Sequence, residues 1–211
     1  MSQYFRIHPE NPQTRLIKQA AQVVSSGGVI ALPTDSSYVL ACHLDDRDAV
    51  TRLRRIRGID ERQHLSLLVR DLAELANFAI VDNQQFRMIR SVTPGPYVFV
   101  LVATKEVPRR LSHPSRKTIG LRVPDHAIVR ALLGELGQPL IASTLTLPPD
   151  DEPLNDPEEI RARLEKQVEL VIDGGACPRE PSTVIDLTGP EPELIRAGRG
   201  SLEPFGLDAT A

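Results

Sequence analysis

The chain has 211 residues, of which 41% are hydrophobic and 25% are charged, so it can bury a core of ordinary globular size. Its 25 basic and 28 acidic residues give a formal net charge of -3. This balance excludes a uniformly basic surface, so any binding of nucleic acid has to depend on a local basic patch. The length favours one domain over residues 1–211.

The first half of the chain alternates helices with short strands. Apolar residues at helical spacing predict a helix over residues 14–25, which Gly27 and Gly28 end. A wholly apolar run over 29–32 is typical of a strand buried on both faces. The elements predicted after it are a helix over 45–57, a strand over 65–69, a helix over 71–78, and a helix from Asp82 to about 92 that begins with a capping box.

The second half is richer in strands. The predicted elements are strands over 97–103, 118–123 and 139–144, a helix over 127–136, a helix beginning at Asp156-Pro157, and strands over 168–172, 182–187 and 193–196. Strands therefore alternate with helices early and follow one another late. This order predicts an α/β (α+β) fold, in which a twisted mixed sheet of about seven strands is flanked by helices.

Signals of several other protein classes are absent from the sequence. Cys42 and Cys177 are too few for a disulfide framework and lack metal-ligand spacing, so we expect free thiols in a reducing cytosol. The first residues do not resemble a signal peptide and no run approaches 18 apolar residues, so we expect a cytoplasmic protein without a membrane span. The histidines do not pair at zinc spacing, and no metal site made of protein side chains is predicted. Without an obvious dimerisation helix, we expect a monomer.

Hydroxyl side chains gather at three turns that follow predicted strands. The turns are Thr34-Asp35-Ser36-Ser37, Ser143-Thr144-Leu145-Thr146, and Asp173-Gly174-Gly175 together with Pro181-Ser182-Thr183. Open α/β sheets bind ligands at the carboxyl ends of their strands, where hydroxyl and free N–H groups can hold a phosphate or a carboxylate. Any one turn alone is also explained by Ser and Thr ending a strand or capping a helix. The sequence has neither a P-loop nor a dinucleotide fingerprint.

Arginine is concentrated at the end of the predicted second helix, as Arg52, Arg54, Arg55 and Arg57. Part of this cluster is explained by the helix dipole, which favours cations at a helix C-terminus. Four like charges nevertheless repel one another unless an anion is present, and guanidinium groups bind phosphate well. We interpret the cluster as an anion site, with a solvated helix face as the alternative. A second basic cluster either belongs to a surface loop or extends the first, and comprises Arg109, Arg110, Arg116 and Lys117.

Together these motifs resemble the YrdC/YciO family. Residues 27–40 resemble its Gly-Gly…Pro-Thr-Asp-Thr-x-Tyr-Gly-Leu opening, and Arg55-Ile56-Arg57 lies where the family has Lys-x-Arg. The motif-bearing part spans about 14–200 and continues in the family's order with Thr93-Pro94-Gly95-Pro96, Thr118–Pro124, Pro181–Asp186 and Arg196-Ala197-Gly198. The chain is most similar to the YciO branch. The resemblance implies a YrdC-like twisted sheet around a positively charged concave cavity.

The best-understood members of this family are L-threonylcarbamoyladenylate synthases. They join ATP, L-threonine and bicarbonate into threonylcarbamoyl-AMP and pyrophosphate, for tRNA modification of the t6A type. The resemblance implies a similar nucleotidyltransferase-type reaction here, with Mg²⁺ accompanying ATP, and it assigns no catalytic residue. It implies that nucleotide and phosphate are bound by Arg55, Arg57, Thr144 and Arg196. It implies that threonine is bound by Thr34, Arg122 and Ser182.

The sequence also departs from the synthases. Val39 replaces a glycine, Leu68 lies in a strand that lacks their histidine, and Thr146 replaces an asparagine. Because one charge-assisted hydrogen bond contributes about 1.5–3 kcal/mol, several lost contacts would give low activity. The alternative function is binding of double-stranded RNA, tRNA or the ribosome through the same cationic cavity. The candidate RNA contacts are then Arg52, Arg54, Arg109, Arg110 and Lys117.

Overall fold

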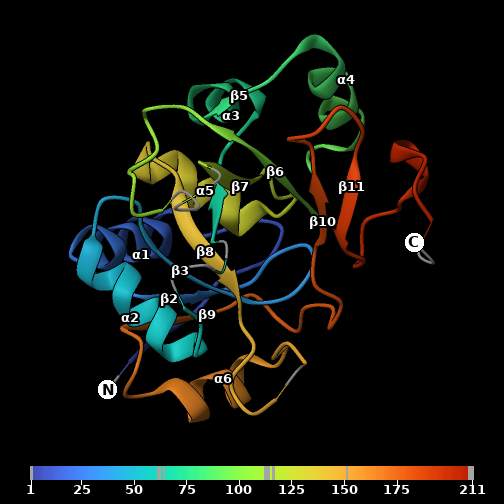
Figure 1. The fold of residues 1–211 in the computed structure, drawn as a ribbon. Coiled ribbons are helices and arrows are strands. Elements are labelled where there is room, and N and C mark those ends of the chain that lie inside the picture. The colour runs from blue at the N-terminus through green and yellow to red at the C-terminus, as the bar shows by residue number, and fades with distance from the viewer. Residues whose placement is uncertain are drawn as a thin grey trace.

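The computed structural model describes residues 2–60, 63, 65–111, 115, 117–150 and 152–208. Its strands join into one mixed sheet in the order β1-β9-β2-β3-β8-β4-β7-β6-β10-β11, with β5 paired to β6 (Figure 1). The strands are β1 (Gln3–Arg6), β2 (Ile30–Leu32), β3 (Val39–His43), β4 (Ser66–Leu68), β5 (Ala79–Ile80), β6 (Tyr97–Ala103), β7 (Thr118–Arg122), β8 (Leu140–Thr144), β9 (Leu170–Asp173), β10 (Thr183–Asp186) and β11 (Glu193–Arg196). The helices are α1 (Thr14–Ser25), α2 (Arg47–Arg57), α3 (Leu72–Phe78), α4 (Asn83–Val92), α5 (Ala127–Leu136), α6 (Pro157–Leu164) and a short 3-10 turn, Glu203–Phe205.

The predicted fold class is confirmed, but the predicted number of about seven strands is wrong, because the described residues contain 11. The unpredicted strands are β1, β3 and β5. Strand β3 is buried almost throughout, so it lacks the alternation of polar and apolar residues that marks a half-buried strand. Strands β1 and β5 are 4 and 2 residues long and exist through their pairing with β9 and β6. That the chain is one domain and a monomer stays a prediction.

Capping residues explain where helices α4 and α2 begin and where α2 ends. The capping box of α4 is present, with the Asp82 carboxylate accepting from two backbone N–H groups and the Gln85 side chain accepting from the Asp82 N–H. Helix α2 begins at residue 47, two residues later than predicted, because Asp46 is its N-cap and accepts from Ala49 N at 2.8 Å. The same helix ends at Gly58, whose φ of 65° lies in the left-handed region.

Helices cover the two faces of the sheet unequally. Helices α1 and α5 pack together over one face and share a buried apolar cluster with residues of β2, β3, β4, β8 and β9. Strands β6, β7 and β10 contribute no residue to that cluster. On the other face, Leu53 and Ile56 of α2 belong to a larger cluster that extends to Tyr97, Phe99 and Phe205. Strands β10 and β11 lie at the side of the sheet away from α1 (Figure 1). On that side, the face of the sheet that α1 and α5 cover elsewhere is not covered by these two helices.

Strand β9 lies between β1 and β2 and runs parallel to both, although about 140 residues of chain separate it from β2. The Glu169 carboxylate just before β9 accepts from Val29 N at 2.7 Å, which ties the two segments together. Cys42 and Cys177 are free and buried. Within the described ranges, no helix is both long and apolar enough to cross a membrane.

Candidate functional site

A hollow of about 540 Å³, here called the floor lobe, lies over the uncovered part of the sheet. Its floor includes a row of paired residues from four adjacent strands, which are Ala142, Ser66, Gly120 and Val100. Paired residues point to the same face of a sheet, so three very small side chains lie side by side. A Cβ atom on Gly120 would lie 3.0 Å from Val98 Cγ1 and 3.1 Å from Ser66 Oγ. Glycine at position 120 therefore leaves room for the neighbouring Val98 and Ser66 side chains.

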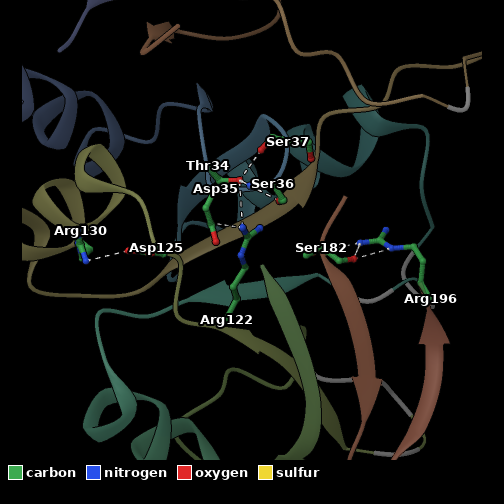
Figure 2. A network of polar contacts seen from close by, with 9 residues as sticks. All are labelled: Thr34, Asp35, Ser36, Ser37, Arg122, Asp125, Arg130, Ser182 and Arg196. Carbon is green, nitrogen blue, oxygen red and sulfur yellow. Dashed lines mark hydrogen bonds and ion pairs between the residues drawn. The ribbon is translucent and has the colours of Figure 1, made fainter. Parts of the chain in front are cut away.

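Two arginines border the floor lobe, Arg57 from the end of α2 and Arg196 from β11. Arg57 Nε donates to Ser143 Oγ at 3.1 Å, and Arg57 Nη1 donates to the Thr146 carbonyl. Arg196 donates to the Ser182 carbonyl, at 2.8 Å from Nη2 and 3.2 Å from Nε (Figure 2). Both guanidinium groups are thus held by neutral oxygens. Among the described residues, neither forms an ion pair with a carboxylate.

The electrostatics of this region favour an anion. Burial lowers the pKa of the Arg57 guanidinium, and the charge of Arg196 lowers it further. Burial also lowers the pKa of Arg196, with a second contribution from the charge of Arg122. Three cations are therefore close enough to disfavour one another's charged forms, and a bound anion would relieve that repulsion.

An adjoining cavity of about 420 Å³, here called the rim lobe, shares Arg57, Thr144 and Arg196 with the floor lobe. Because the same side chains border both cavities, they are two parts of one hollow, with the two arginines where the parts meet. The rim lobe also contains two glutamates, and each is paired with another arginine. These pairs are Glu152 with Arg179 at 3.2 Å and Glu180 with Arg199 at 3.7 Å.

The Thr34 turn is closed by its own side chain (Figure 2) and lines neither lobe of the hollow. Thr34 Oγ1 donates to the Ser37 carbonyl at 2.6 Å and accepts from Ser36 N at 3.1 Å. Arg122, which is only 2% exposed, donates from Nη2 to Asp35 Oδ1 at 2.5 Å and lies 3.3 Å from Thr34 Oγ1. A buried ion pair therefore fixes the turn to β7.

Several polar atoms at this turn are buried without a hydrogen-bond partner among the described residues. They are Asp35 Oδ2, Arg122 Nε and Ser37 Oγ. Leaving such a group unsatisfied costs on the order of 1–3 kcal/mol, so each requires an explanation. Burial lowers the pKa of Arg122 and the charge of Asp35 raises it in part. An acceptor and a donor on one buried ion pair can together satisfy a small ligand that carries both kinds of group.

The structure brings most of the predicted substrate residues together. Arg57, Thr144, Ser182 and Arg196 all line the floor lobe. Thr34 and Arg122 contact each other but line neither lobe. Arg55 does not join them, because it is exposed on α2 and lines neither lobe.

Arg52 and Arg54, both candidate RNA contacts, are engaged within the chain. Arg52 Nη2 lies 2.6 Å from each carboxylate oxygen of Glu169, beside a separate cavity of about 450 Å³ at the end of α1. Arg54 Nη1 donates to the carbonyls of Asp60 and Gln63. The arginine cluster therefore divides, and only Arg57 lines the hollow.

The second basic cluster lies away from the hollow. Arg110 donates to the Leu44 carbonyl at 3.0 Å, and Arg109 is exposed. Lys117 precedes β7 with a φ of 53°, and none of the three lines either lobe. Arg116 lies outside the described residues. Binding of RNA through these residues stays a prediction, which a fall in affinity with rising salt would test.

The three positions at which the sequence departs from the synthases are Val39, Leu68 and Thr146, and they lie in two kinds of environment. Val39 and Leu68 are 4% and 1% exposed and belong to the apolar cluster beneath α1 and α5. Thr146 contributes its carbonyl to the anchoring of Arg57. The sequence did not reveal Asp35 as the partner of Arg122, because 87 residues separate them and only the sheet brings them together.

One glycine of the C-terminal motif has a clear packing reason. A Cβ atom on Gly198 would lie 2.3 Å from the Pro181 carbonyl and 2.7 Å from the Ser182 carbonyl carbon. Only glycine therefore allows the segment after Arg196 to pass this close to the segment that carries Ser182. The spacing between the arginine and the glycine keeps Arg196 within reach of Ser182.

Comparison with known proteins agrees with this fold. A family model described as "Telomere recombination", which represents Sua5, YciO and YrdC proteins, matches residues 22–198. YciO of Escherichia coli (strain K12) is 51% identical over 97% of this chain and 100% of its own length, and the E. coli YciO crystal structure superposes with a TM-score of 0.95. A threonylcarbamoyl-AMP synthase of Halorhodospira halophila is 31% identical over 75% of this chain and 82% of its own.

A more distant solved structure has the same fold. P. abyssi Sua5 complexed with L-threonine is 26% identical, with a TM-score of 0.87, and the match covers 95% of this chain and 58% of that one. The resemblance read from the sequence motifs is thereby confirmed. The chain belongs to the Sua5/YciO/YrdC family.

Proposed function

We propose that this protein is a nucleotidyltransferase-type enzyme that joins ATP, L-threonine and bicarbonate into threonylcarbamoyl-AMP and releases pyrophosphate. The observation that carries the proposal is the pair Arg57 and Arg196, two cations that border one hollow and have no carboxylate partner among the described residues. Relatives named threonylcarbamoyl-AMP synthase and a Sua5 structure with L-threonine support substrates of this class.

The two arginines suit the phosphates of ATP. In this reaction a carboxylate attacks the α-phosphate while pyrophosphate leaves, so the protein has to position the groups and balance negative charge. Arg57 and Arg196 would hold the triphosphate where the two lobes meet, with the Thr144 hydroxyl beside them. Their anchoring by neutral oxygens leaves their charge available to the ligand.

Mg²⁺ would enter this site together with ATP. Within the described residues, no group of three or more His, Cys, Asp or Glu side chains is placed to hold a metal ion. The donors around the floor lobe are arginines and hydroxyls, which fit phosphate oxygens and not a bare cation. When bound, the ion would neutralise charge on the leaving pyrophosphate.

The Thr34 turn suits the amino acid. Arg122 Nε would donate to the threonine carboxylate, and Ser182 lies between Arg122 and Arg196 with its side chain buried (Figure 2). The Thr34 hydroxyl already bonds within the turn, so its contribution would be to shape the subsite. In this arrangement an amino acid would lie next to the phosphate-binding arginines, as a condensation of the two substrates requires.

Pyrophosphate release from ATP tests the proposal. We expect release that requires both L-threonine and bicarbonate, and we expect Arg57→Ala to slow it roughly 10- to 150-fold through the loss of charge-assisted bonds. Arg55→Ala is the matched control, because it removes an arginine of the same helix that lines neither lobe. Release that ignores threonine, or equal losses in the two variants, would overturn the proposal.

A further inference from the structure

Strand β11 pairs with β10 through an irregular register. Val184 pairs with Arg196 while the next residue, Ile185, pairs with Leu194, so Ile195 has no partner on β10. Neighbours on a regular strand point to opposite faces. Here Ile195 and Arg196 both line the floor lobe. A bulge of this kind redirects side chains and is common beside active sites.

The redirected isoleucine adds exposed apolar surface to the hollow. Ile195 is 52% exposed, although it is a large hydrophobic side chain on an edge strand. The floor lobe is also lined by Val98 and Val100 of β6 and by Val184 of β10, and Val98 pairs with Val184. The four side chains form an apolar strip that ends at the edge of the sheet. Apolar surface in a concave site is typically covered by a ligand.

The position of the strip relative to the arginines indicates what covers it. Arg196 follows Ile195 directly, so a ligand held by the guanidinium through an anionic group would have its next portion against the strip. A nucleoside triphosphate combines these properties, since it has charged phosphates at one end and a flat base with apolar faces at the other. Gly120 and Ala142 also line the floor lobe and add little side-chain volume beneath such a ring.

We propose that Ile195 and the three valines form the surface against which the base of the bound nucleotide packs, and that Ile195 is a specificity-determining residue. This inference rests on the proposed function and deepens it. Packing against a base is sensitive to the area of the ring, so the strip favours a purine over a pyrimidine and any nucleotide over a bare polyphosphate.

Calorimetric titration of the full chain with MgATP, MgCTP and magnesium tripolyphosphate tests the inference. We expect the wild type to bind ATP more tightly than CTP, and both more tightly than tripolyphosphate. Ile195→Ala should weaken ATP binding about 4- to 15-fold, as expected for losing one or two buried methylene equivalents, and should leave tripolyphosphate binding unchanged. Ile195→Leu, which keeps the apolar volume, should retain most of the ATP affinity.

Ile80→Ala is the matched control, because Ile80 is 62% exposed on β5 and does not line the hollow. It should change no affinity. Unchanged ATP affinity in Ile195→Ala, an equal loss for tripolyphosphate, or no nucleotide binding by the wild type would each overturn the inference. The calorimetric affinity is measured separately from the pyrophosphate release that tests the proposed function. Nucleotide binding that depends on Ile195 without pyrophosphate release would refute the proposed function alone, and release with unchanged affinity in Ile195→Ala would refute this inference alone.

Discussion

Replacing Asp35 with asparagine tests the buried ion pair that fixes the Thr34 turn. The substitution keeps the shape of the side chain but leaves the Arg122 guanidinium, which is 2% exposed, without its counter-charge at 2.5 Å. Breaking a buried pair in this way costs about 3–5 kcal/mol. The asparagine carbonyl would still accept one hydrogen bond, which contributes about 1 kcal/mol. We therefore expect the free energy of unfolding to fall by about 2–4 kcal/mol.

Guanidinium chloride unfolding followed by circular dichroism measures this change, and circular dichroism is the suitable signal because the chain has no tryptophan. The matched control is Asp125→Asn, since Asp125 and Arg130 form an ion pair at 3.3 Å whose side chains are 56% and 52% exposed. That change should cost less than about 1 kcal/mol. If the two variants differ by less than about 1 kcal/mol, the buried pair does not stabilise the turn as argued.

Two further predictions concern local features. Burial raises the pKa of the Cys42 thiol to about 12 and that of Cys177 to about 11, so a disulfide reagent at pH 8 should label native protein slowly and denatured protein at once. Rapid labelling of both thiols in the native state would contradict their burial. Asp82→Ala removes the capping box of α4 and should lower the free energy of unfolding by about 0.5–2 kcal/mol, whereas Asp82→Asn should preserve most of it. Equal losses in the two variants would show that the cap is not the cause.

All six α-helices of the described residues could be predicted from the sequence, because the signals for a helix lie within the helix or next to it. The capping box at Asp82 and the Asp156-Pro157 start each lie within a few positions of the helix they begin, and the structure contains both. Strand β1 could not be predicted this way. Its four residues, of which only Tyr4 and Phe5 are partly buried, become a strand only through pairing with β9, whose sequence lies more than 160 residues later.

In the site, too, nearby residues could be predicted from the sequence, whereas contacts between distant segments could not. The sequence revealed a concentration of arginines, and helical spacing alone could not decide which of them would meet a ligand. Arg52 is neutralised by Glu169, which follows it by 117 residues. Arg57 lines the hollow, where its Nε donates to Ser143 Oγ. The row of small residues on the floor is likewise invisible in the sequence, because its members come from three separate segments and align only through sheet register.

The place of β9 between β1 and β2 has a consequence for synthesis of the chain. A ribosome-bound fragment that ends before residue 170 has made both flanking strands but not the strand that separates them, so the hydrogen-bonding edge of β2 stays open. Such a fragment exposes apolar surface to aggregation and to chaperones until residues 170–173 emerge. The second arginine of the hollow is carried by β11, so the hollow cannot form before residue 196 has been synthesised. If the proposed function holds, nucleotide stabilises the folded protein but not a fragment that lacks β11.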